Sequence, residues 1–122
     1  MDIQIKRIYE PAARTDGKRV LVDRLWPRGM SRERAHFDEW LKDIAPSPQL
    51  RAWFRHISSK FDEFSRKYRT ELDTDPEKRA AVSHLLELVM AGKVTLLYGA
   101  KNTTANHALV LQSYLKEKGK EH

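Results

Sequence analysis

The chain has 122 residues, of which 40% are hydrophobic and 33% charged, a size and balance typical of one globular domain that exclude collagen-like and wholly disordered chains. It has no cysteine, which excludes disulfides, thiolate metal sites, Fe–S clusters and cysteine nucleophiles. The formal net charge is +6, and the basic excess lies in residues 14–34 and 51–69, so these segments are candidates for contact with a phosphate, a nucleotide or a nucleic acid.

The first part of the chain predicts two strands separated by a loop. Ile3, Ile5 and Ile8 indicate a strand that ends near Tyr9, and residues 10–17 form a loop closed by an Asp-Gly turn signal. The apolar run within residues 18–25 predicts a second strand that is covered on both faces. A loop of about eight residues is too short for a usual parallel crossover, so the two strands are either antiparallel neighbours or separated by another strand.

The middle of the chain predicts amphipathic helices, because apolar residues recur three or four positions apart. Ser47 as N-cap and Pro48 in the first turn begin the second of these helices. A capping signature at residues 74–77 begins the last one, and Gly92 ends it. The apolar faces are, in chain order, Phe37-Trp40-Leu41-Ile44, Leu50-Trp53-Phe54-Ile57, Phe61-Phe64-Tyr68-Leu72 and Ala81-Val82-Leu85-Leu88-Val89.

The last part of the chain predicts a strand, a short loop and a helix. Residues 94–98 form an apolar strand, and Thr103 or Thr104 caps a final helix, beyond which residues 116–122 are expected to fray. The whole order predicts a single α/β domain over residues 1–122, with a small mixed or mostly parallel sheet of three to four strands covered by about five helices. The strands at 18–25 and 94–98 are expected to lie parallel at its centre.

Ligands of open α/β sheets bind beyond the carboxyl ends of the parallel strands, which singles out residues 23–29 and 98–107. In the first segment, Arg24 and Arg28 flank a turn that includes Gly29, and guanidinium groups bind phosphate or carboxylate through paired hydrogen bonds. Trp26 offers a face for stacking a ring, and Asp23 could orient an arginine or act as a general base. The alternative is structural, with an internal Asp–Arg pair and Trp26 in the core.

The second segment joins a strand, a small-residue loop and a helix start, an arrangement that binds anions through free backbone N–H groups. His107, near the start of the helix, is the other candidate for proton transfer, with a packed or solvated histidine as the alternative. The histidines and carboxylates lack the spacing of a zinc site, so neither a metal nor a cofactor is expected. The candidate ligand-binding residues here are Tyr98, Lys101, Thr103, Thr104 and Asn106.

Five stretches carry a family resemblance: residues 22–29 (VDRLWPRG), 40–47 (WLKDIAPS), 50–54, 68–72 and 94–101 (VTLLYGAK). They resemble the YeaO-like family, a branch of Domain of Unknown Function 488, over nearly the whole chain. The resemblance implies a compact α/β protein of the bacterial or archaeal cytosol, in a family without an established function. Relatives often carry Cys and His near the late strand and helix start, whereas this chain has Ala100 and no cysteine there, so the resemblance implies no thiol chemistry.

The leading hypothesis is a small cytoplasmic protein with a phosphate-recognising pocket, and the sequence leaves open whether it is an enzyme acting on a nucleotide or a related phosphorylated metabolite. One alternative is non-specific nucleic-acid binding through the basic segments, which would weaken steeply with salt. Another is a protein-interaction module that uses the Trp- and Phe-rich helices. No membrane partner is expected, because no run approaches the ~18 apolar residues of a membrane span and the N-terminus has no apolar leader region. The oligomeric state stays open.

Overall fold

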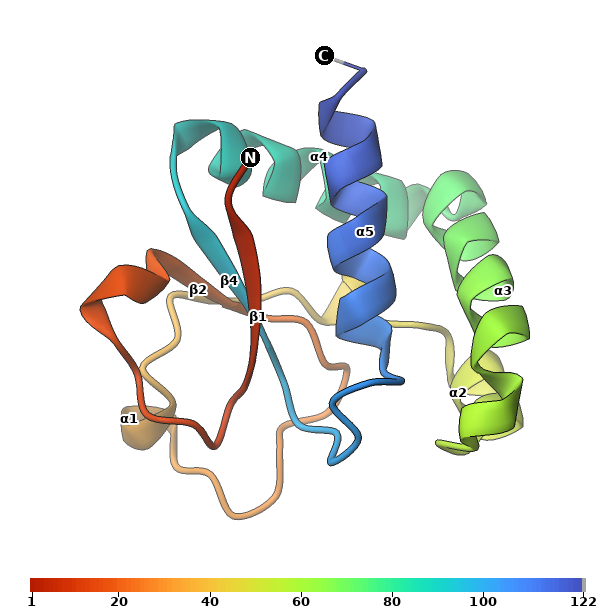
Figure 1. The fold of residues 1–122 in the computed structure, drawn as a ribbon, viewed down its shortest axis with the longest axis horizontal. Coiled ribbons are helices and arrows are strands. Elements are labelled where there is room, and N and C mark those ends of the chain that lie inside the picture. Colours follow the sequence, from red (N-terminus) through yellow and green to blue (C-terminus); the bar gives the residue numbers. More distant parts are fainter. Residues whose placement is uncertain (122) are drawn as a thin grey trace.

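The two most apolar segments of the chain form the centre of a parallel sheet. The structure, a computed structural model, describes residues 1–121. Its sheet has the order β1-β4-β2-β3, with β1 at Ile3–Arg7, β2 at Lys18–Leu21, β3 at Glu39–Trp40 and β4 at Val94–Tyr98 (Figure 1). Every pairing is parallel, and β4 lies between β1 and β2, which confirms the second of the two predicted arrangements for the first two strands.

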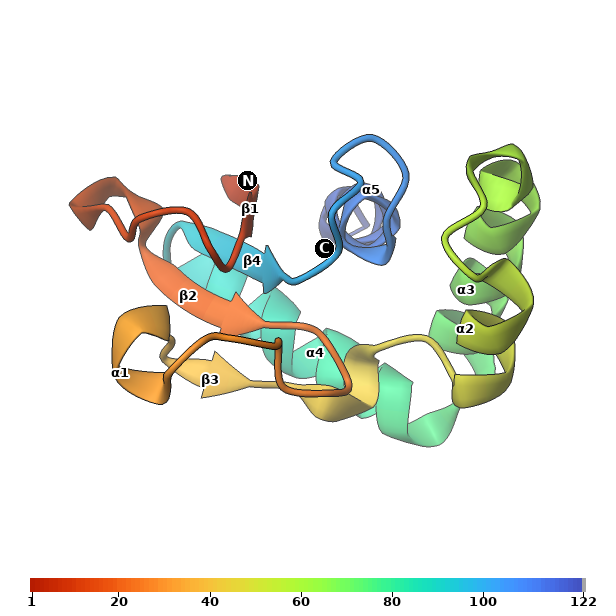
Figure 2. The ribbon, with the colours of Figure 1, turned by 90° about the horizontal axis from the view of Figure 1, so that it is seen from below.

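Helices cover the two faces of this sheet unequally. The main core joins Val20 and Leu96 to the three long helices, whereas Leu21 and Leu97 point into a smaller core beside α1. Figure 2 shows α1 and the long helices on opposite sides of the strands. The result is a single α/β domain, as predicted. Its helices are α1 (Arg32–Ala35), α2 (Pro48–Phe54), α3 (Phe61–Thr74), α4 (Pro76–Ala91) and α5 (His107–Gly119), with 3-10 turns at Arg14–Asp16, Lys42–Ile44 and Ser58–Lys60.

Three helix predictions are confirmed by the caps that begin them and the faces that they bury. The Ser47 hydroxyl accepts a hydrogen bond from the Leu50 N–H at the start of α2, and the Asp75 carboxylate accepts one from the Glu77 N–H at the start of α4. Helix α4 ends before Gly92, as predicted. Helix α3 buries Phe64, Tyr68 and Leu72, the predicted stripe.

The helix predicted from Phe37 to Ile44 is wrong. Helix α1 ends at His36, whose φ of 47° is left-handed, and the chain then joins the edge of the sheet as β3. The Asp38 N–H donates to the Arg19 carbonyl, and the Asp38 carboxylate accepts from the Arg19 N–H. The apolar residues of this stretch therefore divide between two cores, with Phe37 and Trp40 in the smaller one and Leu41 and Ile44 in the main one.

Three predicted boundaries also need correction. Strand β2 ends at Leu21 instead of residue 25, because Asp23 turns to contact the end of β4. Helix α2 ends at Phe54, which leaves Ile57 exposed. The N-cap of α5 is Asn106, not Thr103 or Thr104, since the Asn106 side chain accepts from the Leu109 N–H. Helix α5 continues to Gly119, and fraying of residues 116–122 stays a prediction; His122 lies outside the described residues.

A buried carboxylate fastens the loop before β2 to the sheet. The Asp16 side chain, 1% exposed, accepts hydrogen bonds from Lys6, Arg19, Gln4 and the Ala13 N–H. Burial acts to raise its pKa, but the bonds from the Ala13 N–H, Lys6 and Arg19 outweigh burial and lower the pKa from 3.8 to about 2. Asp16 therefore stays ionised and paired in the folded protein at neutral pH.

Among the helices within residues 1–121, none has both the length and the apolar character that crossing a membrane requires.

Candidate ligand-binding site

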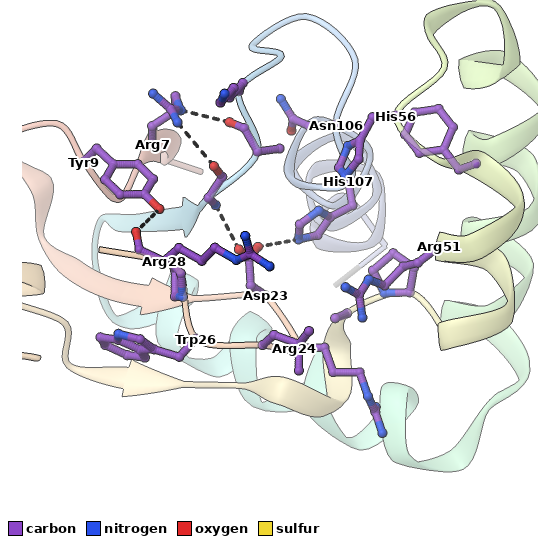
Figure 3. A pocket seen from close by; sticks show the side chains of 18 of the residues that line it. Arg7, Tyr9, Asp23, Arg24, Trp26, Arg28, Arg51, His56, Asn106 and His107 are labelled. Carbon is purple, nitrogen blue, oxygen red and sulfur yellow. Dashed lines mark hydrogen bonds and ion pairs between the residues drawn. The ribbon is translucent and has the colours of Figure 1, made fainter. Parts of the chain in front are cut away.

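A cavity of about 720 Å³ opens at the carboxyl ends of β1, β2 and β4, the edge of the sheet that the strand order predicts (Figure 3). Its walls come from the loops that follow these strands, from α2 and α3, and from the start of α5. The lining residues are Arg7, Tyr9, residues 23–28, Ala45, Pro46, Arg51, Phe54, His56, Phe64, residues 99–101, Asn106 and His107.

The cavity is strongly basic. Five cationic side chains line it, and Asp23 is the one carboxylate among its lining residues. Within residues 1–121, none of the five cations lies in an ion pair with a carboxylate, and four of them also make no side-chain hydrogen bond. These are Arg24, Arg28, Arg51 and Lys101. The two basic segments of the sequence thus meet here, one through Arg24 and Arg28 and the other through Arg51.

The fifth cation, Arg7, holds the loop after β4 in place. Its guanidinium donates to the carbonyl of Ala100 at 2.9 Å and to that of Gly99 at 3.3 Å. The neighbouring Tyr9 hydroxyl donates to the Arg28 carbonyl at 2.7 Å, and the Arg7 guanidinium lies 4.8 Å from the centre of the Tyr9 ring. The end of β1 therefore fixes both loops that carry the predicted site, as the dashed lines of Figure 3 show.

Asp23 and His107 connect the ends of β2 and β4 to the start of α5. One carboxylate oxygen of Asp23 accepts the Gly99 N–H at 2.9 Å, and the other lies 3.1 Å from Nε2 of His107. Nε2 also lies 3.1 Å from the Val22 carbonyl. Because both neighbours of Nε2 are acceptors, this nitrogen carries a proton. The proton is directed at the Val22 carbonyl, so the second carboxylate oxygen is buried without a hydrogen bond from the described residues.

The contacts of Asp23 differ from the internal Asp–Arg pair that was one of its predicted arrangements. Its ion-pair partner within the described chain is His107, so the predicted internal Asp–Arg pair is absent there. The two side chains are 17% and 16% exposed, so they form part of the floor of the cavity rather than its mouth. Behind His107 the buried Tyr68 ring packs at 6.4 Å, and its hydroxyl donates to the Ile44 carbonyl. Burial raises the pKa of Tyr68 well above its usual value, which keeps it neutral.

Trp26 lines the cavity, but its ring is occupied by other contacts. The rings of Phe37 and Trp40 meet it edge-on at 5.4 and 5.3 Å, and the Arg32 guanidinium lies 4.7 Å from its centre. Its indole N–H donates to the Met30 carbonyl at 2.6 Å. This packing matches the alternative in which Trp26 belongs to the core, and leaves little of the ring for a ligand.

The other predicted site residues are divided between the cavity and its surroundings. Lys101 and Asn106 line the cavity, and Asn106 also caps α5. Tyr98 is 2% exposed and packs in the main core, where burial, with a contribution from Glu10, raises its pKa. Gly29, Thr103 and Thr104 are exposed and do not line the cavity.

Sequence reasoning missed four lining residues with polar side chains. Arg7 and Tyr9 follow a third parallel strand, so the rule that identified the other two loops would have found them had the order of β1 been known. Arg51 lies in the second basic segment, which was a candidate for anion contact but was not assigned to this site. His56 had no sequence signal, because its position depends on two consecutive left-handed residues after α2.

The fold and cavity together define a small parallel α/β domain with a basic cavity at the carboxyl edge of its sheet. Residues 2–122 match the family described as the inactive DUF488-N3 subclade, and the chain belongs to this branch of DUF488. The family resemblance inferred from the sequence is thereby confirmed.

The chain is similar to relatives along almost its full length. It is 44% identical over 116 residues to the uncharacterized protein YeaO of Escherichia coli K12, a match that covers 95% of this chain and 98% of YeaO. It is 37% identical over 113 residues to the uncharacterized proteins Mb3100c of Mycobacterium bovis and Rv3073c of Mycobacterium tuberculosis, with 93% of this chain and 92% of each relative covered. No solved structure matches the chain.

Proposed function

We propose that this protein binds a small organic phosphate in the basic cavity. The observation that carries the proposal is a set of four cations around one cavity whose side chains have no ion pair or hydrogen bond within residues 1–121, Arg24, Arg28, Arg51 and Lys101. Guanidinium groups bind phosphate oxygens through paired hydrogen bonds, and a lysine adds a point charge. All four side chains are exposed, so they are accessible to an anion that enters the cavity.

The size of the cavity favours an organic phosphate over the inorganic ion. Its volume of about 720 Å³ falls within the roughly 300–1,000 Å³ typical of small-molecule sites. Part of the wall is apolar, formed by residues such as Pro46, Phe54 and Phe64. A phosphate ion alone would leave this wall unfilled, whereas a nucleotide or another phosphorylated metabolite would cover it.

Binding without turnover fits the polar groups on the cavity floor. The Nε2 proton of His107 and one Asp23 oxygen are already engaged with the Val22 carbonyl and the Gly99 N–H. These bonds hold the ends of β2 and β4 and the start of α5 together, so we assign Asp23 and His107 a positioning role. The description of the matched subclade as inactive supports the same reading.

The test is a thermal-shift titration with organic phosphates, using the wild type and an Arg24→Ala/Arg28→Ala variant. A ligand at ~100 times its Kd stabilises the fold by about 2.7 kcal/mol, which is several degrees of Tm for a domain of this size. The matched control is Arg66→Ala/Lys67→Ala, which removes the same charge from exposed positions of α3 outside the cavity. A shift that the control retains and the double arginine variant loses supports the proposal, whereas equal shifts in all three proteins contradict it.

A further inference from the structure

The cations of the cavity are shared unequally between its walls, with Arg51 on the wall formed by α2 and α3 and the others on the opposite wall. Arg24, Arg28 and Lys101 come from the loops after β2 and β4, whereas Phe54 and Phe64 come from α2 and α3. Figure 3 shows Arg28 on one side of the Asp23–His107 pair, and Arg51 and His56 on the other. An anionic ligand held by the first wall would therefore extend its uncharged part toward α2 and α3.

Among the aromatic side chains that line the cavity, His56 combines an exposed ring with the absence of any polar contact to the described residues. Phe54 and Phe64 are 5% and 1% exposed and stack on each other at 4.2 Å. An arginine guanidinium lies over the Tyr9 ring and another over the Trp26 ring, and His107 is bonded to the Val22 carbonyl. The His56 side chain is exposed and makes no hydrogen bond or ion pair with the residues that the structure describes.

The backbone presents His56 to the cavity in an unusual way. Arg55 and His56 have φ values of 49° and 58°, and two consecutive left-handed residues without glycine are costly. They end α2 and turn the His56 ring over Phe54, with ring centres 6.0 Å apart and planes inclined by 51°. His36 is also left-handed but lies outside this cavity, so the inference rests on the place of His56 and not on its φ value.

We infer that the organic phosphate is a nucleotide, with its phosphate bound by Arg24, Arg28 and Lys101 and its base stacked on the His56 ring. This inference rests on the proposed function and specifies its ligand. A nucleobase presents a flat π face that can stack on the exposed His56 ring. Sugar phosphates have no such face, so they would use the cationic wall alone.

The experiment is isothermal titration calorimetry with the four common nucleoside 5′-monophosphates, ribose 5-phosphate and inorganic phosphate. The proteins are the wild type, His56→Asn and the control His36→Asn, since asparagine tolerates a left-handed backbone but has no aromatic ring. Circular dichroism melting establishes that each variant is folded.

In the wild type, at least one nucleoside monophosphate is expected to bind about tenfold or more tightly than ribose 5-phosphate, the effect of one base stacked on an aromatic ring. His56→Asn should remove that advantage and leave the Kd of ribose 5-phosphate unchanged, while His36→Asn changes neither.

Two results would overturn the assignment and leave the phosphate site standing: ribose 5-phosphate binding as tightly as every nucleotide, or a nucleotide preference that survives in His56→Asn. Binding of none of these phosphates would contradict the proposed function itself, and the nucleotide assignment with it.

Discussion

Replacing Asp23 by alanine should destabilise the fold. The Asp23 carboxylate accepts the Gly99 N–H at 2.9 Å and lies 3.1 Å from the protonated Nε2 of His107. A buried donor that loses its acceptor costs ~1–3 kcal/mol, and bonds to charged acceptors lie toward the upper end of that range. We therefore expect Asp23→Ala to lower the free energy of unfolding by about 2 kcal/mol.

The assay is urea denaturation of the ligand-free protein, followed by tryptophan fluorescence. The variant should shift the midpoint without changing the slope, because the change affects stability and not the surface exposed on unfolding. The control is Glu87→Gln, an exposed acidic position on α4 whose substitution should change stability by less than about 0.5 kcal/mol. A loss of less than about 0.5 kcal/mol for Asp23→Ala would refute the positioning role of the carboxylate.

A second substitution, Asp23→Asn, separates a positioning role of this carboxylate from a ligand-binding role. Asp23 is the one carboxylate that lines a cavity of five cations, so its negative charge opposes an incoming phosphate. Asp23→Asn keeps an acceptor for the Gly99 N–H and removes the charge. We expect it to tighten phosphate binding in calorimetry; weaker binding in a folded Asp23→Asn protein would mean that the carboxylate contacts the ligand directly.

Three further predictions concern stability and selectivity. Because the folded pKa of Asp16 is lowered to about 2 from 3.8, its contribution of about 2 kcal/mol is complete above pH ~5 and lost as the pH falls toward 2; urea titrations should show this slope, and Asp16→Asn should flatten it. Gly99→Ala would place a methyl group 3.0 Å from the Asp23 carboxylate and should lower the free energy of unfolding by about 1 kcal/mol, seen as a lower thermal midpoint. An unchanged melting curve would disprove this effect. Arg66→Ala/Lys67→Ala should leave small-phosphate affinity unchanged, and a loss of that affinity would contradict the cavity assignment. If oligonucleotides bind through this face of α3, the variant should reduce the slope of log affinity against log salt by roughly two.

Local patterns predicted the elements whose apolar residues all face one core. Helix α3 is such a case, since Phe64, Tyr68 and Leu72 all contact the main core. The stretch from Phe37 to Ile44 shows the opposite case. In this stretch a strand and a 3-10 turn, which pack on two different cores, produce the same spacing of apolar residues as a helix. Only the pairing of β3 with β2 shows that the stretch is not a helix.

The site was predictable to the extent that strand order could be inferred. The carboxyl ends of β2 and β4 were expected to converge, and Arg24, Arg28, Lys101, Asn106 and His107 do line one cavity with Asp23. The sequence could not assign Tyr98 to the core. All residues of β4 are buried, so the strand shows no alternation of polar and apolar side chains from which the direction of Tyr98 could be inferred. It also could not place Arg51, which reaches the cavity only because α2 packs against α3 beside the sheet edge.

The arrangement of bonds around the cavity explains how a small domain can keep several cations close together. Backbone carbonyls accept from Arg7, and the Tyr9 hydroxyl anchors the Arg28 backbone, so the loops are fixed without using the heads of the other arginines. The one lining carboxylate is engaged with Gly99 and His107 instead of an arginine. Because the loop backbones are already fixed, binding of an anion has to order only the exposed cationic side chains. The cost of holding these like charges together in the free protein is what a bound phosphate would relieve.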